Sequence, residues 1–187
     1  MALWTKGTAM KSVLILSSSP RKNGNSELLC KAFAEGAQAA GHRVEHIRIA
    51  EKRIGYCIAC YACKQLGRCV FEDDASAILE KMLAADVIVL ASPVYFYSIS
   101  AQLKALFDRT VAIYPRLTNK TYYYLLTMAD TERKQFDLVL AAMRGFLDCY
   151  EGSREAGMVC ADGVEEAGAV ANTPFVEAAR ALGQAIV

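Results

Sequence analysis

One polar segment of the chain has the residue types that bind a phosphate. Residues 17–26 read Ser-Ser-Ser-Pro-Arg-Lys-Asn-Gly-Asn-Ser and lead from a short apolar run into a helical pattern. The free N–H groups and the partial positive charge at the start of a helix attract phosphate. Hydroxyl, amide and guanidinium groups add hydrogen bonds. The donors that we single out are Ser19, Arg21, Asn25 and Ser26.

Two familiar phosphate motifs are absent from this segment. It contains neither the G-x-x-x-x-G-K-[ST] pattern of P-loop proteins nor the G-x-G-x-x-G pattern of dinucleotide-binding proteins. Two interpretations stay open. The segment is either a cradle for a single phosphate, built mainly from side chains, or a polar turn with an asparagine helix cap.

Three consecutive aromatic residues, Tyr95, Phe96 and Tyr97, follow a second apolar run. In open α/β sheets, ligands bind at the C-terminal ends of the strands, where the strand order reverses. A phosphate on the polar segment and a flat ring beside these aromatic residues would belong to one phosphorylated planar molecule, for which FMN is the obvious candidate. The alternative is that the three rings pack in the core, which a surface loop between a strand and a helix does not favour.

Four of the seven cysteines crowd into a third segment with the spacing C-x2-C-x2-C-x5-C, and they are Cys57, Cys60, Cys63 and Cys69. Four thiolates can hold a [4Fe–4S] cluster or a tetrahedral zinc ion. Three cysteines spaced two apart with a fourth nearby is a ferredoxin-like arrangement, whereas zinc sites more often consist of two separated pairs. A cluster, a zinc ion and free or redox-active thiols all stay open.

Other residues with reactive or charged side chains are assigned structural roles. The acidic run 72–74 precedes a helical pattern and is interpreted as its cap. The histidines have no partner at ligand spacing and are interpreted as surface or packing residues; they are His42 and His46. Three cations are interpreted as solvated charges rather than nicotinamide-phosphate ligands: Arg109, Arg116 and Lys120. The cysteines outside the cluster are interpreted as small buried residues: Cys30, Cys149 and Cys160.

The elements that must position these residues alternate between two hydrophobic periods. Short β-rich runs predict strands over 12–17, 43–49, 86–91, 121–127 and 157–161. Longer patterns predict helices over 26–40, 74–85, 99–112, 131–150 and 173–186. This alternation predicts an α/β fold, a parallel sheet of order 2-1-3-4-5 covered by helices on both faces. In that order the strands before the polar segment and the aromatic residues are neighbours.

The length of 187 residues suits one domain, which we expect over 12–187, after an N-terminal tail over 1–11. The irregular stretch 50–73 contains the cysteine cluster, and a gap of this length in a compact domain is usually functional. With 21 Lys and Arg against 20 Asp and Glu, the net charge of +1 argues against a nucleic-acid partner. No apolar run approaches the ~20 residues that span a membrane, and no export signal is recognised, so we expect a cytoplasmic protein.

The segments 18–26, 92–98 and 102–109, together with the cysteine spacing, resemble those of the flavodoxin-like NADPH-dependent FMN reductases, and within them the iron–sulfur flavoprotein group. The likeness covers residues 12–186. The resemblance implies that 19–26 holds the FMN phosphate and that 93–98 lines the isoalloxazine ring, through Pro93, Val94, Tyr95, Phe96, Tyr97 and Ser98. It also implies that the loop after the fourth strand, with Thr127 and Asp130, completes the ring site.

The resemblance implies an FMN-dependent oxidoreductase that passes electrons from NAD(P)H through the flavin to a quinone, flavin or protein acceptor. This chemistry requires no side-chain acid or base, so no catalytic residue is named. The alternative is an electron carrier with a [4Fe–4S] cluster on the four cysteines beside FMN, and a weaker third possibility is a thiol-based redox switch. Relatives form dimers and tetramers, and the apolar side chains of 50–73 favour a homodimer or homotetramer.

Overall fold

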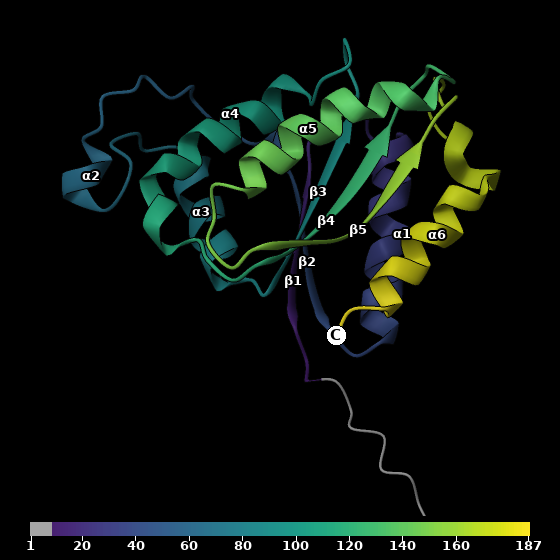
Figure 1. Cartoon of the computed structure of the whole chain (residues 1–187), viewed down its shortest axis with the longest axis horizontal. Coiled ribbons are helices and arrows are strands. Elements are labelled where there is room, and N and C mark those ends of the chain that lie inside the picture. Colours follow the sequence, from purple (N-terminus) through teal and green to yellow (C-terminus); the bar gives the residue numbers. More distant parts are fainter. Residues whose placement is uncertain (1–8) are drawn as a thin grey trace, which may run out of the picture.

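The computed structural model describes residues 9–187 (Figure 1), so most of the tail expected over 1–11 lies outside the described residues. Five strands form one parallel sheet of order β2-β1-β3-β4-β5. The strands are β1 (Ser12–Ser17), β2 (Arg43–Arg48), β3 (Val87–Pro93), β4 (Thr121–Thr127) and β5 (Arg154–Ala161). The predicted fold and strand order are confirmed. Within residues 9–187 there is no helix with the length and apolar character needed to cross a membrane.

Helices cover both faces of the sheet (Figure 1). One face carries α1 (Asn25–Ala39) and α6 (Pro174–Gln184), and the other carries α3 (Asp74–Ala84), α4 (Ala101–Arg109) and α5 (Phe136–Leu147). Side chains alternate along β1, so that Val13 and Ile15 pack in the core on the α1 side, whereas Leu14 and Leu16 pack in the core on the other side. Because both faces are buried, residues 13–16 of β1 form an uninterrupted apolar run in the sequence.

The boundaries of three predicted elements differ in the structure. The helix expected over 99–112 ends at Arg109 and continues as the 3-10 helix η2 (Thr110–Arg116), which contains Pro115 and therefore one backbone donor fewer. The helix expected over 131–150 is shorter, with the 3-10 helix η3 (Arg133–Gln135) before α5. The fifth strand begins at Arg154 rather than at residue 157. Its first residues were not recognised because this half-buried edge strand lacks the apolar run that marks the central strands.

The irregular stretch expected over 50–73 is present. It begins within the 3-10 helix η1 (Ile49–Glu51), contains the single-turn helix α2 (Cys63–Leu66) and leads into α3. A further 3-10 helix, η4 (Ala169–Asn172), precedes α6.

The helices α1 and α6 touch backbone to backbone at two glycines. A Cβ atom at Gly36 would overlap the carbonyl oxygen of Arg180, and a Cβ at Gly183 would overlap that of Phe33. Replacing Gly183 by alanine should therefore lower the free energy of unfolding by about 1–3 kcal/mol, because the helices must separate to admit the methyl group. Urea denaturation of the variant measures this loss.

The control for this prediction is Gly145, which also lies within a helix but has open space around the position of its missing Cβ. Replacing Gly145 by alanine should raise the stability by about 0.5–1 kcal/mol, since alanine favours the helical backbone. If both variants changed stability in the same direction, close packing of α1 on α6 would not be the reason that Gly183 is required.

Candidate cofactor-binding site

The loops that follow β1, β3, β4 and β5 meet at the C-terminal edge of the sheet and enclose a pocket of 230 Å³. The pocket is lined by Ser19, Arg21, Asn25, Ser26, Pro93, Val94, Tyr95, Thr127, Ala129, Val164 and Glu165. The structure thus brings the predicted phosphate residues together with the first half of the predicted ring loop. Four other predicted residues are not among those lining the pocket: Phe96, Tyr97, Ser98 and Asp130.

The start of α1 leaves its backbone donors available to a ligand. Gly24 is the N-cap residue, and it lacks a side chain that could accept hydrogen bonds from the first turn. By contrast, Asp73 and Ser100 cap α3 and α4 through their side-chain oxygens. An anion in the pocket would therefore meet free N–H groups and the positive end of the helix. The alternative interpretation of residues 17–26, an asparagine-capped turn, does not agree with the glycine at the cap position.

Two of the predicted phosphate residues also tie neighbouring loops together. The guanidinium Nη1 of Arg21 donates to the carbonyl oxygen of Glu165 at 2.7 Å, which leaves other donors of this exposed group free. The hydroxyls of Ser26 and Thr127 lie 2.9 Å apart and are both buried. This pair joins the first turn of α1 to the end of β4.

Asn25 has a positioning role that the sequence does not reveal. Its Nδ2 donates to the carbonyl oxygens of Val164 and Glu166 at 3.1 and 2.9 Å, and its Oδ1 accepts from the N–H of Val170 at 3.1 Å. Both amide protons are thus used by the loop after β5. Asn25 lines the pocket, but its amide holds this loop against α1 and so brings Val164 and Glu165 to the site.

Three buried serines connect the loop after β1 with the loop after β3. The hydroxyl of Ser18 donates to the carbonyl oxygen of Ala91, and the hydroxyl of Ser100 donates to that of Ser18 at 2.7 Å. The hydroxyl of Ser92 accepts from the N–H of Ser100 at 2.9 Å. Because these polar groups are fully buried and mutually satisfied, they fix the spacing of the two loops. All three lie next to the segments that we expected to bind ligand, and none of them was itself predicted to bind it.

The aromatic residues after β3 are not core residues. Tyr95, Phe96 and Tyr97 form a tight turn with Ser98, and Phe96 is completely exposed. The hydroxyl of Tyr97 donates to Oδ2 of Asp130 at 3.1 Å. This hydrogen bond raises the pKa of Tyr97, because it holds the phenol in its protonated form. Tyr97 and Asp130, which are not among the lining residues, thereby join the loop after β3 to the loop after β4.

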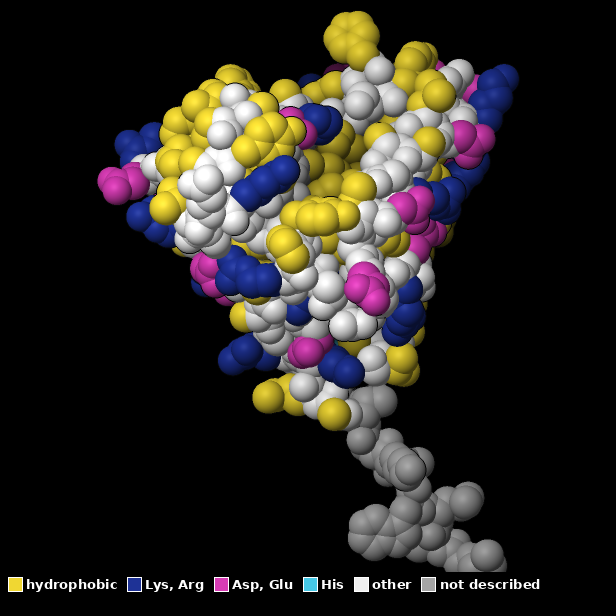
Figure 2. All heavy atoms as spheres, turned by 60° about the vertical axis from the view of Figure 1, so that its left-hand side comes forward, with side chains coloured by type: hydrophobic (Ala, Val, Ile, Leu, Met, Phe, Trp, Pro, Cys, Tyr) yellow, Lys and Arg dark blue, Asp and Glu magenta, His cyan; other side chains and the backbone are white. Residues whose placement is uncertain are grey.

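The four clustered cysteines, Cys57, Cys60, Cys63 and Cys69, all line one cavity of 320 Å³ beside Arg109. Their segment forms a lobe at the side of the molecule, where Figure 2 shows apolar side chains gathered on the surface. Over residues 9–187, no group of three or more Cys, His, Asp or Glu side chains is close enough to hold a metal ion. The thiols therefore share a cavity without forming a preassembled ligand set.

Arg109 is not the solvated charge that the sequence suggested. It is buried, and its guanidinium donates to both carboxylate oxygens of Asp73, at 2.6 and 3.0 Å, and to the carbonyl oxygen of Gly55 at 2.8 Å. Burial alone would raise the pKa of Asp73, but the hydrogen bonds from Arg109, Gly55 and Ala75 outweigh it and lower the pKa. The N–H of Ala75 is the capping contact of α3, so the cap predicted from the acidic run is confirmed at Asp73.

The remaining structural assignments are confirmed in part. Lys120 is half-buried and donates to the last carbonyls of α3, so it is not a solvated charge, whereas Arg116 is exposed. His42 is a packing residue, buried against Lys11 and Ile186. His46 is half-buried beside Glu27 and away from the pocket. Of the cysteines expected to be buried, Cys30 is buried, Cys160 is half-buried and Cys149 is exposed, because it follows the end of α5.

The fold and the sequence both match known proteins. A solved NAD(P)H:quinone oxidoreductase from Methanothermobacter marburgensis superposes with a TM-score of 0.75 at 20% identity over 94% of this chain and 96% of its own. An FMN-dependent NADH-azoreductase from Bacillus anthracis, solved in complex with FMN, superposes with a TM-score of 0.69 at 15% identity over 92% of this chain and 98% of its own. At these identities the likeness shows the fold.

The sequence comparison is more specific. An iron–sulfur flavoprotein of Methanocaldococcus jannaschii is 45% identical over 98 residues, which are 52% of this chain and 51% of that protein. The chain thus matches about half the length of this curated relative. The family model for NADPH-dependent FMN reductases matches residues 11–171, which include every loop of the pocket. The chain belongs to the NADPH-dependent FMN reductase family.

Proposed function

We propose that the chain is an FMN-dependent oxidoreductase that passes electrons from NAD(P)H through bound flavin to a quinone, flavin or protein acceptor. The observation that carries this proposal is the pocket at the C-terminal edge of the sheet, in which the uncapped start of α1 faces the ring loop after β3. Family membership and the structural likeness to an NAD(P)H:quinone oxidoreductase and an FMN-dependent azoreductase support it.

The pocket suits the phosphate end of FMN. The donors there are Arg21, the hydroxyls of Ser19 and Ser26, and the free N–H groups of the first turn of α1. The volume of 230 Å³ is below the ~300–1,000 Å³ of pockets that enclose a whole ligand. A flavin held here by its phosphate would place its ring at the mouth, between Tyr95 and the loop after β4.

The chemistry is that of the flavin, which accepts a hydride and releases electrons singly or in pairs. The chain would bind and orient it. Residues 93–95 and the loop after β4 lie beside the mouth. The N–H groups of Val94, Tyr95 and Met128 already donate to backbone carbonyl oxygens, so they would hold these loops in place around a bound ring rather than donate to it. Tyr95 presents a half-exposed aromatic face there, and Thr127 is held in place by Ser26. No side chain is required to transfer a proton.

The direct test is reconstitution with FMN. Purified protein should bind about one FMN per chain, absorb near about 450 nm and oxidise NADPH or NADH in the presence of a quinone. The physical reason is that the pocket would hold the phosphate and its mouth the ring, both within one chain. A protein that stays colourless and does not bind added FMN would contradict the proposal.

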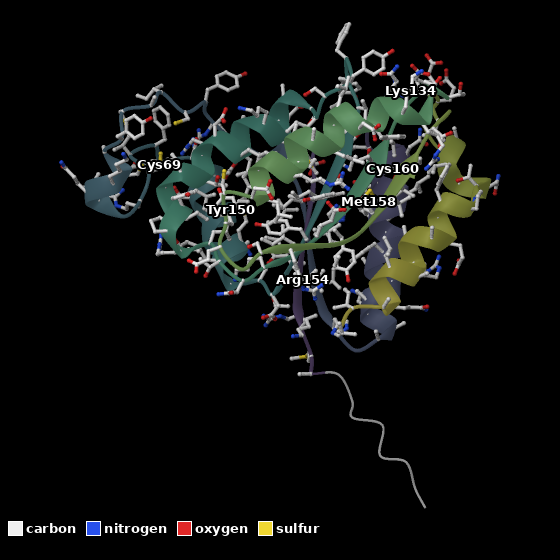
Figure 3. The ribbon with its side chains drawn as sticks, viewed as in Figure 1. Cys69, Lys134, Tyr150, Arg154, Met158 and Cys160 are labelled. Carbon is white, nitrogen blue, oxygen red and sulfur yellow. The ribbon has the colours of Figure 1, made fainter. Side chains whose placement is uncertain are left out.

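The second candidate function is an electron carrier with a [4Fe–4S] cluster on Cys57, Cys60, Cys63 and Cys69. The observation that favours it is that all four thiols line one cavity, beside the buried cation of Arg109. Figure 3 shows Cys69 on one side of the molecule and Lys134, which follows the loop after β4, on the other. The cavity lies at the C-terminal end of α4 and the ring loop at its N-terminal end, so about 13 Å of helix separates them in one chain.

Iron and sulfide analysis of protein purified without oxygen decides between the candidates. About four iron atoms per chain would support the carrier, and FMN without iron would support the reductase. In the carrier, electrons would pass between the cluster and the flavin either over the length of α4 in one chain or between two copies of the chain. We therefore propose a homodimer or homotetramer, and sedimentation analysis of the same preparation measures its size. A thiol switch would instead appear as disulfide pairs in the mass spectrum of oxidised, iron-free protein.

A further inference from the structure

The turn after β3 has an unusual backbone. The N–H and carbonyl groups of Tyr95 and Ser98 exchange two hydrogen bonds of 3.0 Å, and the residues between them, Phe96 and Tyr97, have φ angles of 48° and 57°. A two-residue connection with positive φ at both central positions is typical of a type I′ turn, which favours asparagine and glycine. Large aromatic residues in this conformation are strained, so other contacts must hold the turn in place.

The side chain of Tyr97 supplies such a contact. Its hydroxyl donates to Oδ2 of Asp130, whose Oδ1 accepts from the N–H of Glu132 at 2.9 Å. The hydrogen bond from Glu132 and that from Tyr97 lower the pKa of Asp130, so its carboxylate is a charged acceptor at neutral pH. A bond between a phenol and a carboxylate is stronger than one between two neutral groups.

The hydrogen bond between Tyr97 and Asp130 lies close to residues that line the pocket. The pocket lining includes Pro93, Val94 and Tyr95 from one loop and Thr127 and Ala129 from the neighbouring one. Tyr97 lies two residues beyond Tyr95, and Asp130 directly follows Ala129. In Figure 1 the loop after β3 projects beyond the end of the sheet. The bond from Tyr97 to Asp130 therefore joins the two neighbouring loops just beyond the residues that line the pocket.

We propose that the Tyr97–Asp130 hydrogen bond is a latch that holds the strained turn against the loop after β4 and so limits the size of the acceptor that reaches the flavin. Tyr97 is a positioning residue in this account and not a catalytic one. With the latch closed, the turn is held beside the loop after β4. With the latch open, the turn relaxes away and the mouth widens. The inference rests on the proposed FMN site, because the mouth is that of the ring-binding side.

The test uses the full chain reconstituted with FMN and the variants Y97F and D130N. Y97F removes only the hydroxyl, and D130N keeps a side-chain oxygen that can accept from Tyr97. The control is Y114F, because Tyr114 is also half-exposed but lies in η2, away from the pocket. The acceptors are benzoquinone, with one ring, and anthraquinone sulfonate, with three fused rings. The readouts are kcat/KM for each acceptor, the rate of FMN dissociation and amide hydrogen exchange at Tyr95 and Ser98 in FMN-free protein.

We expect Y97F to raise the anthraquinone-to-benzoquinone ratio of kcat/KM by about 3- to 10-fold and FMN dissociation by a similar factor, as suits the loss of one hydrogen bond. Exchange at Tyr95 and Ser98 should also become several-fold faster. D130N keeps an acceptor for Tyr97 but loses the charge, so it should change the ratio less than Y97F does, and Y114F should change nothing.

The outcomes separate the latch from the proposed function. Unchanged hydrogen exchange in Y97F would overturn the latch, whatever the enzyme assay gives. Faster exchange with an unchanged acceptor ratio would overturn its role at the mouth. If the original chain bound no FMN at all, the proposed function would be wrong. The proposed limit on acceptor size would then be wrong too, even if hydrogen exchange showed that the bond holds the turn.

Discussion

Replacing Arg21 and Ser26 together by alanine should weaken FMN binding by roughly 100-fold and riboflavin binding by less than about threefold. Both side chains line the end of the pocket where we propose that the phosphate binds, and a hydrogen bond to a charged group contributes about 1.5 kcal/mol or more. Riboflavin has no phosphate and so loses only indirect contacts. Quenching of flavin fluorescence on titration with protein measures both affinities.

Two controls make this prediction specific. Lys22 lies in the same loop but is exposed, outside the pocket lining and 3.7 Å from Glu51, so Lys22→Ala should change FMN affinity by less than about threefold. Ser26 also contacts Thr127, so urea unfolding of the double variant checks that the pocket still folds. Equal losses of FMN and riboflavin would show that the phosphate does not bind at the start of α1.

The parts of the fold that follow from local pattern were predictable. β1 and β3 are buried on both faces, and this favours apolar residues at successive positions of a strand, which is visible in the sequence at 13–16 and 87–91. The neighbouring position of the two ligand loops followed from the strand order. The path of residues 52–62 did not, because its position depends on contacts such as Arg109 to Gly55, between residues 54 positions apart.

The candidate site was also predictable where it depends on local residue types, and it was not predictable where it depends on contacts between distant residues. The residue types of 17–26 indicate anion binding because this segment leads from a strand into the start of a helix. The positioning role of Asn25 could not be predicted from the sequence. Its amide donates to the backbone carbonyls of Val164 and Glu166, about 140 residues away, and a backbone carbonyl leaves no signal in the sequence. The same holds for Tyr97 and Asp130, whose pairing requires the adjacency of β3 and β4.

Replacing Arg109 by methionine should lower the free energy of unfolding by about 3–5 kcal/mol at pH 7. The guanidinium is buried and makes two bonds to Asp73, so its removal leaves a carboxylate without its main partner. It also removes the bond to Gly55 and the contact with the ring of Phe71, at 5.0 Å from its centroid. Urea denaturation measures the loss, and hydrogen exchange should show it first in residues 52–62.

The pH dependence of this loss identifies its cause. Because the pKa of Asp73 is lower in the folded chain than the ordinary value of about 3.9, the stabilisation from this carboxylate is complete above about pH 4 and is lost as the pH falls through the folded-state value. The difference between the original chain and R109M should therefore shrink as the pH is lowered below about 4. R109K, which keeps a positive charge but not the two parallel bonds, should lie between them. A difference that stayed constant across this range would mean that Arg109 stabilises the cysteine segment by packing rather than through its pair with Asp73.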